Sequence, residues 1–182
     1  MTRLLVLGML DIQPMSGYDV QLMLKLNDSE RWAGVLIGSI YHALKKMEAE
    51  GYVEVICIEQ TGHRQKAVYQ ITEKGREYLK ELTRDALKNA SVVYPSSLYS
   101  GLSFVEKLPK EEAISALNVQ AAALEQECRI FENGLLAKKA ALHGIIPPMT
   151  ELIFENIFAI IRQQQDFIER AKQLLNSSGT TE

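Results

Sequence analysis

The spacing of apolar residues divides the chain near residue 90. Before that point the patterned segments are short and of mixed type, and after it they are long and helical. Leu4–Leu10 is apolar almost all round, which predicts a short buried helix. A second helix is predicted over Gly17–Leu26, because Ser16 and Asp19 have the spacing of a capping pair and apolar residues follow at intervals of three and four. Residues 27–29 are expected to end it.

The segment Ile37–Gly51 predicts a helix with two distinct faces. One face is an apolar stripe with spacings of three, one and three, made of Ile40, Ala43, Leu44 and Met47. The opposite face presents small, basic and hydrogen-bonding residues, namely Gly38, His42, Lys45 and Ala49, flanked by Tyr41 and Lys46. Because this face lacks acids, it indicates a binding surface and not an ordinary solvated one. Gly51 stands where a left-handed residue would end the helix.

A β-hairpin is predicted directly after this helix. Tyr52–Glu59 is rich in β-branched residues, residues 60–65 have the composition of a turn, and Lys66–Ile71 has apolar residues at period two. The tip of the hairpin carries His63, Arg64 and Lys66. Thr72 is placed to cap a further helix, from Glu73 to about Lys88.

Three short helices followed by a hairpin with a basic tip predict a winged helix-turn-helix. An α-helix fits the major groove of DNA, about 12 Å wide, where its side chains reach base edges. The phosphates that flank the groove require cations, which Lys45, Lys46 and Arg64 can supply. An arginine at a hairpin tip can also enter a narrow minor groove. DNA is therefore the expected partner of this region.

Two long amphipathic helices are predicted in the second half, separated by Gly144–Pro148. The first carries an apolar row with alternating spacings of three and four, and the second carries two such rows side by side. This hairpin cannot bury its wide apolar faces alone, so packing against a second copy in coiled-coil fashion is the simplest solution. The residues predicted to form the dimer interface are Leu124, Phe131, Ile153, Ile157, Ile160, Phe167 and Leu174. The other row of the second helix contains Phe154, Phe158, Ile161, Ile168 and Leu175.

These segments together predict a mainly α-helical fold with a small β-hairpin, of the α+β class. The predicted organisation is a winged helix-turn-helix DNA-binding domain over residues 1–88, a connector over 89–109, a helical dimerisation domain over 110–178 and a disordered tail over 179–182. A length of 182 residues fits one ample domain or two small ones.

The distribution of charge is more informative than its sum. The net charge of −3 lies entirely in residues 89–182, because residues 1–88 carry 12 basic and 12 acidic residues. A nucleic-acid surface must therefore be a local patch. The balanced charge leaves an alternative open, a dimeric winged-helix adaptor that binds a protein partner instead of DNA. Binding that weakens steeply with added salt would distinguish DNA binding from this alternative.

The sequence lacks the marks of an enzyme, a metal protein or a membrane protein. It contains no Gly-rich phosphate loop, no Gly-x-Ser-x-Gly elbow and no paired-His metal spacing. Neither catalysis, a cofactor nor a bound metal is therefore expected. Cys57 and Cys128 cannot form a disulfide framework and suit a reducing compartment. The apolar run that closes at Asp11 is too short to span a membrane and is followed by no cleavage site, so a cytoplasmic protein is expected.

Several motifs, in order and at fitting spacing, resemble the PadR family of bacterial transcriptional regulators over roughly residues 4–85. They are Leu7-Gly8-Met9-Leu10, Pro14-Met15-Ser16-Gly17-Tyr18, Trp32, Ile37-Gly38-Ser39-Ile40-Tyr41-His42-Ala43-Leu44-Lys45-Lys46-Met47-Glu48, Glu50-Gly51-Tyr52-Val53, the hairpin residues Arg64, Lys66 and Tyr69, and Ile71-Thr72-Glu73-Lys74-Gly75. Two places depart from the family pattern. His42 stands where the family most often has proline, and Val35-Leu36-Ile37 replaces a more polar lead-in. The C-terminal region resembles that of the larger members in length and layout.

The resemblance implies a homodimer that binds a palindromic double-stranded DNA operator, usually as a repressor, and releases it when a small effector binds. The residues expected to contact DNA are Tyr18, Ser39, Tyr41, His42, Lys45, Lys46, Arg64 and Lys66. A small aromatic or drug-like effector is expected near Trp32, Tyr94 and Tyr99. Packing in the core is the simpler interpretation of Trp32.

Overall fold

The structure, a computed structural model, describes residues 1–27, 29–61, 64–89 and 92–177, with the backbone alone for residues 59–61 and 64–65. The chain divides into two units, Met1–Val92 and Val93–Glu182. The sequence predicted the corresponding boundary after Lys88. The tail over 179–182 lies outside the described residues.

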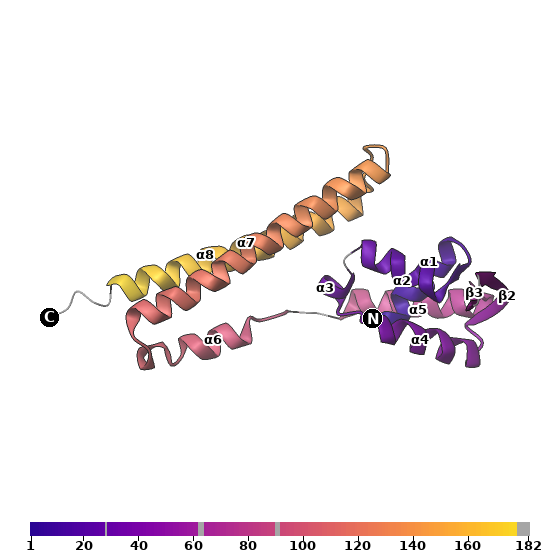
Figure 1. Ribbon diagram of the computed structural model, residues 1–182, viewed down its shortest axis with the longest axis horizontal. Coiled ribbons are helices and arrows are strands. Elements are labelled where there is room, and N and C mark those ends of the chain that lie inside the picture. Colours follow the sequence, from indigo (N-terminus) through magenta and orange to yellow (C-terminus); the bar gives the residue numbers. More distant parts are fainter. Residues whose placement is uncertain (28, 62–63, 90–91, 178–182) are drawn as a thin grey trace. The chain divides into compact units, whose positions relative to one another are not determined.

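Helices packed around α1 form most of the N-terminal unit (Figure 1). Its helices are α1 (Thr2–Ile12), α2 (Gly17–Leu26), α3 (Ser29–Ala33), α4 (Ile37–Ala49) and α5 (Glu73–Lys88). Contacts from α1 to α2, α4 and α5 hold them together. The buried core between them consists of Val6, Leu7, Leu10, Met15, Val20, Leu24, Val35, Ile40, Ala43, Leu44, Met47, Val53 and Ile71.

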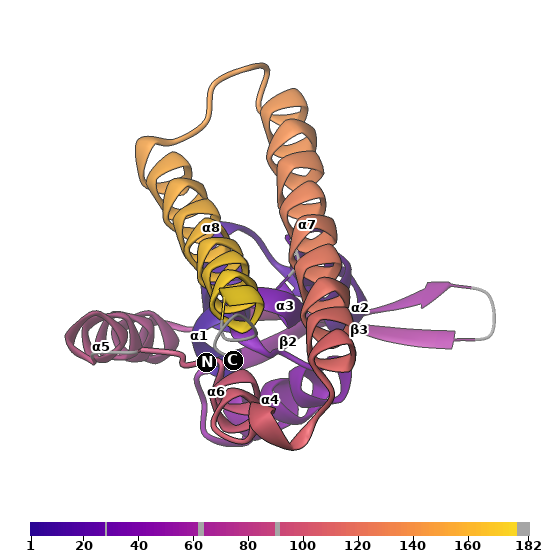
Figure 2. The ribbon, with the colours of Figure 1, turned by 90° about the vertical axis from the view of Figure 1, so that its left-hand side faces the viewer.

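A three-stranded antiparallel sheet completes this unit. Its strands are β1 (Met15–Ser16), β2 (Val53–Thr61) and β3 (Arg64–Ile71), in the order β1-β3-β2. Met15 pairs with Tyr69, which ties the start of α2 to the hairpin. Figure 2 shows the β2–β3 hairpin extending away from the helices of its own unit. The fold class is confirmed, a mainly helical chain with a small β-sheet.

Local sequence signals predicted several element boundaries correctly. The predicted capping pair of α2 is a complete capping box, in which Ser16 Oγ accepts from the Asp19 amide and the Asp19 carboxylate accepts from the Ser16 amide. Thr72 Oγ1 accepts from the Gly75 amide and caps α5, as predicted. Gly51 has a φ of 76° and ends α4 in the left-handed conformation, also as predicted.

Three features of this unit differ from the prediction. Four helices precede the hairpin and not three, because α3 begins at Ser29, where the sequence predicted only a break. The two-residue strand β1 was also not predicted. Trp32 is not in the core. Its side chain is 48% exposed, and its indole N–H donates to the Asn27 carbonyl at 2.8 Å, so the chain holds the ring at the surface of the unit.

Two long helices lie side by side in the C-terminal unit (Figure 1). They are α7 (Lys110–Ala141) and α8 (Pro148–Ser177), and they follow α6 (Ser96–Leu102) and a 3-10 turn, η1 (Val105–Lys107). The sequence had predicted α6 and η1 as connector. The residues buried between the long helices include Phe131, Ile161 and Ile168. No helix within the described ranges is long and apolar enough to cross a membrane.

Candidate nucleic-acid interface

Helix α4 has the two faces that its sequence predicted. The buried stripe is confirmed, since Ile40, Ala43, Leu44 and Met47 are each at most 6% exposed. Gly38, His42, Lys45 and Ala49 on the opposite face are all exposed. The core therefore fixes the rotation of the helix and leaves an acid-poor face in solvent. We call Gly38, Tyr41, His42, Lys45 and Lys46 the α4 face.

The two ends of α4 are built differently. At its C-terminal end, the Gly51 amide donates to the Glu48 carbonyl and the Tyr52 amide to the Met47 carbonyl, so the chain turns at once into β2. At its N-terminal end the capping residue is Leu36, which has no side-chain oxygen to offer. The hydroxyl of Ser39 donates to the Leu36 carbonyl at 2.6 Å and so does not replace the missing acceptor.

The Tyr41 side chain lies against the first turn of α2. A Cβ atom at Gly17 would lie 2.7 Å from Cε1 of the Tyr41 ring, so only glycine lets the ring approach this closely. The Tyr41 hydroxyl reaches Gln21 Oε1 at 3.4 Å. These contacts position an aromatic ring, 48% exposed, beside the α4 face. Gln21 was not predicted, although its position one helical turn after Gly17 is the signal that could have indicated it.

Strand β3 of the hairpin is joined to α2 by an ion pair. Lys66 Nζ lies 3.0 Å from Asp19 Oδ1 and 2.8 Å from Oδ2, and 5.8 Å from the centre of the Tyr18 ring. Hydrogen bonds from Lys66 and from Ser16 lower the pKa of Asp19 below its ordinary value. The sequence indicated Asp19 only as a capping residue. Part of the positive charge expected of Lys66 is therefore neutralised within the unit.

The other predicted DNA-contact residues are placed as follows. Lys45 and Lys46 are exposed and make no ion pair with another described residue. Tyr18 is 58% exposed. Ser39 lies 3.3 Å from Thr2 Oγ1 and is half-buried, so its hydroxyl is held within the unit. His63 and the side chain of Arg64 lie outside the described residues.

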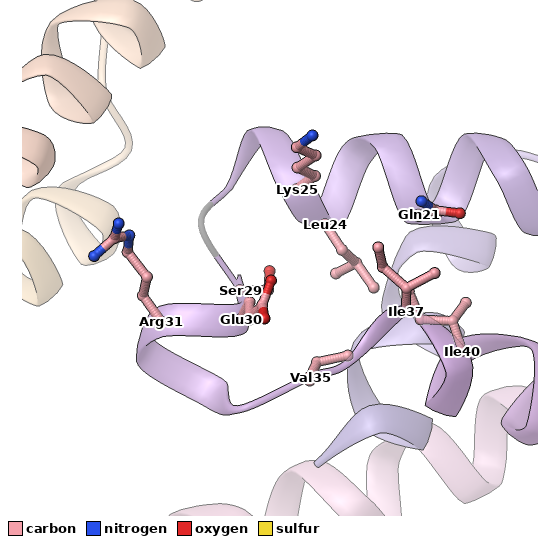
Figure 3. Close-up of a pocket in the computed structure, with 9 residues that line it drawn as sticks. All are labelled: Gln21, Leu24, Lys25, Ser29, Glu30, Arg31, Val35, Ile37 and Ile40. Atoms are coloured by element: carbon pink, nitrogen blue, oxygen red, sulfur yellow. The ribbon is translucent and has the colours of Figure 1, made fainter.

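A hollow of about 500 Å³ opens between α2, α3 and the start of α4 (Figure 3). It is lined by Gln21, Leu24, Lys25, Ser29, Glu30, Arg31, Val35, Ile37 and Ile40. The hydroxyl of Ser29 is buried beside it without a hydrogen-bond partner among the described residues. The sequence did not predict this hollow, because α3, which forms one wall, was not predicted.

The three residues suggested for an effector belong to different units. Trp32 is in the N-terminal unit, and Tyr94 and Tyr99 are in the C-terminal unit. Tyr94 is 64% exposed. The ring of Tyr99 contacts that of Phe167 edge to face, with centres 5.7 Å apart, so this tyrosine contributes to packing between α6 and α8.

The two apolar rows of α8 lie in different environments. Ile161 and Ile168 are buried against α7. In the row predicted to face a second copy, Ile153, Ile160 and Leu174 are 53%, 51% and 69% exposed. Three of the remaining predicted interface residues, Leu124, Ile157 and Phe167, are half-buried. The fourth, Phe131, is buried and contacts Phe154 within the hairpin.

Comparison with known proteins identifies a family that the N-terminal unit matches. Residues 6–81 match the family described as transcriptional regulator PadR-like. That family is one of regulators, not of enzymes. A comparison with the curated proteins finds no match.

Solved structures resemble the whole chain in fold. The structure of Bacillus subtilis PadR in complex with operator DNA has a TM-score of 0.71 at 19% identity, over 95% of this chain and 98% of that one. The structure of the same protein in complex with p-coumaric acid has a TM-score of 0.71 at 17% identity, over 96% and 98%. The Vibrio cholerae virulence activator AphA has a TM-score of 0.72 at 16% identity, over 98% and 99%. At these identities the likeness concerns the fold.

Proposed function

From the premise that residues 6–81 form a PadR-like transcriptional regulator domain, we propose that this protein is a dimeric, sequence-specific DNA-binding repressor. Helix α4 enters the major groove, and the β2–β3 hairpin is the wing that contacts the flanking backbone or minor groove. The C-terminal helices join two copies, so that two α4 helices meet the two halves of a palindromic operator. A small effector weakens this binding.

The α4 face is the observation that carries the proposal. Its buried stripe anchors the helix in the core, and its exposed side offers Lys45, Lys46 and His42 without an acid between them. DNA requires this combination, because cations neutralise phosphates while small and hydrogen-bonding residues approach base edges. Tyr41, a member of this face, and Tyr18, at the start of α2, are exposed residues that each carry a hydroxyl group.

The exposed row of α8 supports dimerisation. Ile153, Ile160 and Leu174 would remain in water in a single chain, whereas a second copy packed along α8 would cover them. Two copies related by a twofold axis present two α4 helices with matching symmetry, which is why a palindromic operator follows from a dimer.

Effector release is supported by solved structures of similar fold, which differ in the sign of regulation that their names give. Structures of Bacillus subtilis PadR contain operator DNA in one case and p-coumaric acid in another, and the Vibrio cholerae relative is an activator. The expectation of an effector near Trp32, Tyr94 and Tyr99 remains a prediction from the sequence. Binding of a ligand there would reduce DNA affinity by linkage, since it would favour a different arrangement of the dimer.

Replacing Lys45 with alanine tests the assignment of the α4 face. We expect Lys45→Ala to weaken binding to a duplex that the wild-type protein selects from a random library by about threefold to tenfold. The slope of log K against log salt should become less negative by about 1, because one phosphate contact is lost. Fluorescence anisotropy over a salt series measures both.

Lys88→Ala is the matched control, since Lys88 is an exposed lysine of the same unit at the end of α5. It should leave affinity and slope unchanged. If Lys45→Ala behaves like Lys88→Ala, the α4 face is not the DNA-contact surface.

A further inference from the structure

The start of α4 violates two ordinary preferences at adjacent residues. Leu36 caps the helix with an extended backbone (φ −79°, ψ 147°) but offers no side-chain acceptor to the free amides of the first turn. Leu36 and Ile37 are also large aliphatic side chains that stay 60% and 50% exposed. Local preferences are most often broken where a binding function requires it.

Few polar side-chain groups of this first turn remain for reading bases. The Ser39 hydroxyl donates to the Leu36 carbonyl at 2.6 Å, so its proton is already engaged within the turn. Gly38 has no side chain, and a Cβ built there would meet nothing within 4 Å. The side chains of the first turn therefore offer a partner mainly methyl and methylene groups. Figure 3 shows the Ile37 side chain at the start of α4, directed toward α2 and lining the hollow.

Duplex DNA has one apolar group in its major groove, the C5-methyl of thymine. The N-terminal residues of a recognition helix are the ones that reach base edges. The charges on the same helix match DNA as well, since Lys45 and Lys46 follow on its exposed side. The aliphatic side chains of Leu36 and Ile37 are thus suited to making apolar contacts with thymine methyl groups.

We propose that Leu36 and Ile37 contact thymine C5-methyl groups and thereby select A·T base pairs under the first turn of α4. The inference rests on the proposed function, because it assumes that α4 lies in the major groove. Leu36 and Ile37 are not among the residues expected from the sequence to contact DNA, so the inference gives base specificity to two further residues.

Replacing thymine by deoxyuridine tests this, because the exchange removes only the methyl group. The probe is the duplex that the wild-type protein selects from a random library, with each thymine exchanged in turn. We expect the wild-type protein to lose about fourfold in affinity for each contacted methyl at one or two thymines of the site, and to ignore the exchange elsewhere.

Two variants connect the effect to the protein. Leu36→Ser and Ile37→Ser should bind the thymine and deoxyuridine duplexes more nearly alike at those same positions. Ile12→Ser is the matched control, since Ile12 is a 71% exposed isoleucine of the same unit at the end of α1, and it should keep the full discrimination. Trp32 fluorescence checks that each variant is folded.

The outcomes separate the inference from the proposed function. A wild-type protein that selects no duplex overturns the proposed function and this inference with it. Selective binding that is indifferent to every exchange overturns this inference alone. So does full discrimination retained by both Leu36→Ser and Ile37→Ser.

Discussion

Ile160→Asp is expected to convert the protein from a dimer into a monomer and to weaken its binding to an operator duplex by about 100-fold. Ile160 is 51% exposed in the single chain, so a carboxylate there meets water and leaves the α7–α8 hairpin folded. In the proposed dimer the same carboxylate would be buried against apolar side chains without a partner, which opposes association. A monomer carries one α4 and loses the gain from binding both half-sites at once.

Size-exclusion chromatography with light scattering measures the mass, and fluorescence anisotropy measures the affinity. Gln163→Asp is the matched control, because Gln163 is an exposed polar residue of the same helix and receives the same charge. It should remain dimeric and bind normally. If Ile160→Asp stays a dimer, or becomes a monomer with undiminished affinity, the proposed coupling of dimerisation to DNA binding is wrong.

Gly75→Ala is expected to lower the free energy of unfolding of the N-terminal unit by about 3 kcal/mol. Gly75 lies in the first turn of α5, where a Cβ atom would collide with the backbone carbonyl oxygen of Tyr52 and come within 2.8 Å of Ile71 Cγ1. The Tyr52 carbonyl is itself fixed, because it accepts from the Thr72 amide at 3.1 Å. Backbone on both sides must therefore move to admit one methyl group.

Urea unfolding followed by Trp32 fluorescence measures this effect, since the only tryptophan of the chain lies in the N-terminal unit. Gly8→Ala is the control. Gly8 lies inside α1 with nothing within 4 Å of an added Cβ, so alanine there should be neutral or stabilise by about 0.5–1 kcal/mol. Equal stability of the two variants would contradict the close approach of α5 to Tyr52.

Signals that act over a few residues made much of the N-terminal unit predictable. The Ser16–Asp19 capping box, the Thr72 cap and the left-handed Gly51 each depend on groups within four residues. The buried stripe of α4 follows from helical periodicity alone. By contrast, β1 has two residues, and it exists only because Met15 and Ser16 pair with residues more than fifty positions later. No local pattern encodes such a strand.

The candidate site was predictable in its residue types but not in its internal contacts. The exposed face of α4 was expected, yet three of its neighbours have partners that the sequence did not reveal. Lys66 pairs with Asp19, Ser39 donates to the Leu36 carbonyl, and Tyr41 reaches Gln21. The Lys66–Asp19 and Tyr41–Gln21 contacts depend on how α2, α4 and the hairpin pack, which spacing along the chain does not determine, whereas the Ser39–Leu36 contact lies within the first turn of α4.

The two apolar rows of α8 show the same limit of prediction from sequence. Periodicity identified both rows but could not decide which one packs within the chain. The structure buries Ile161 and Ile168 against α7 and leaves Ile153, Ile160 and Leu174 exposed. Which row meets a second copy remains a prediction, and Ile160→Asp tests it.

We propose that this protein binds DNA selectively through a cationic surface. The most direct measurement is a gel shift of the purified protein with the DNA upstream of its own gene, beside a scrambled duplex, at low and at physiological salt. We expect a selective complex whose affinity falls steeply with added salt, because phosphate contacts release counterions. Absence of any complex with either duplex at low salt would contradict it and favour a winged-helix adaptor that binds a protein partner.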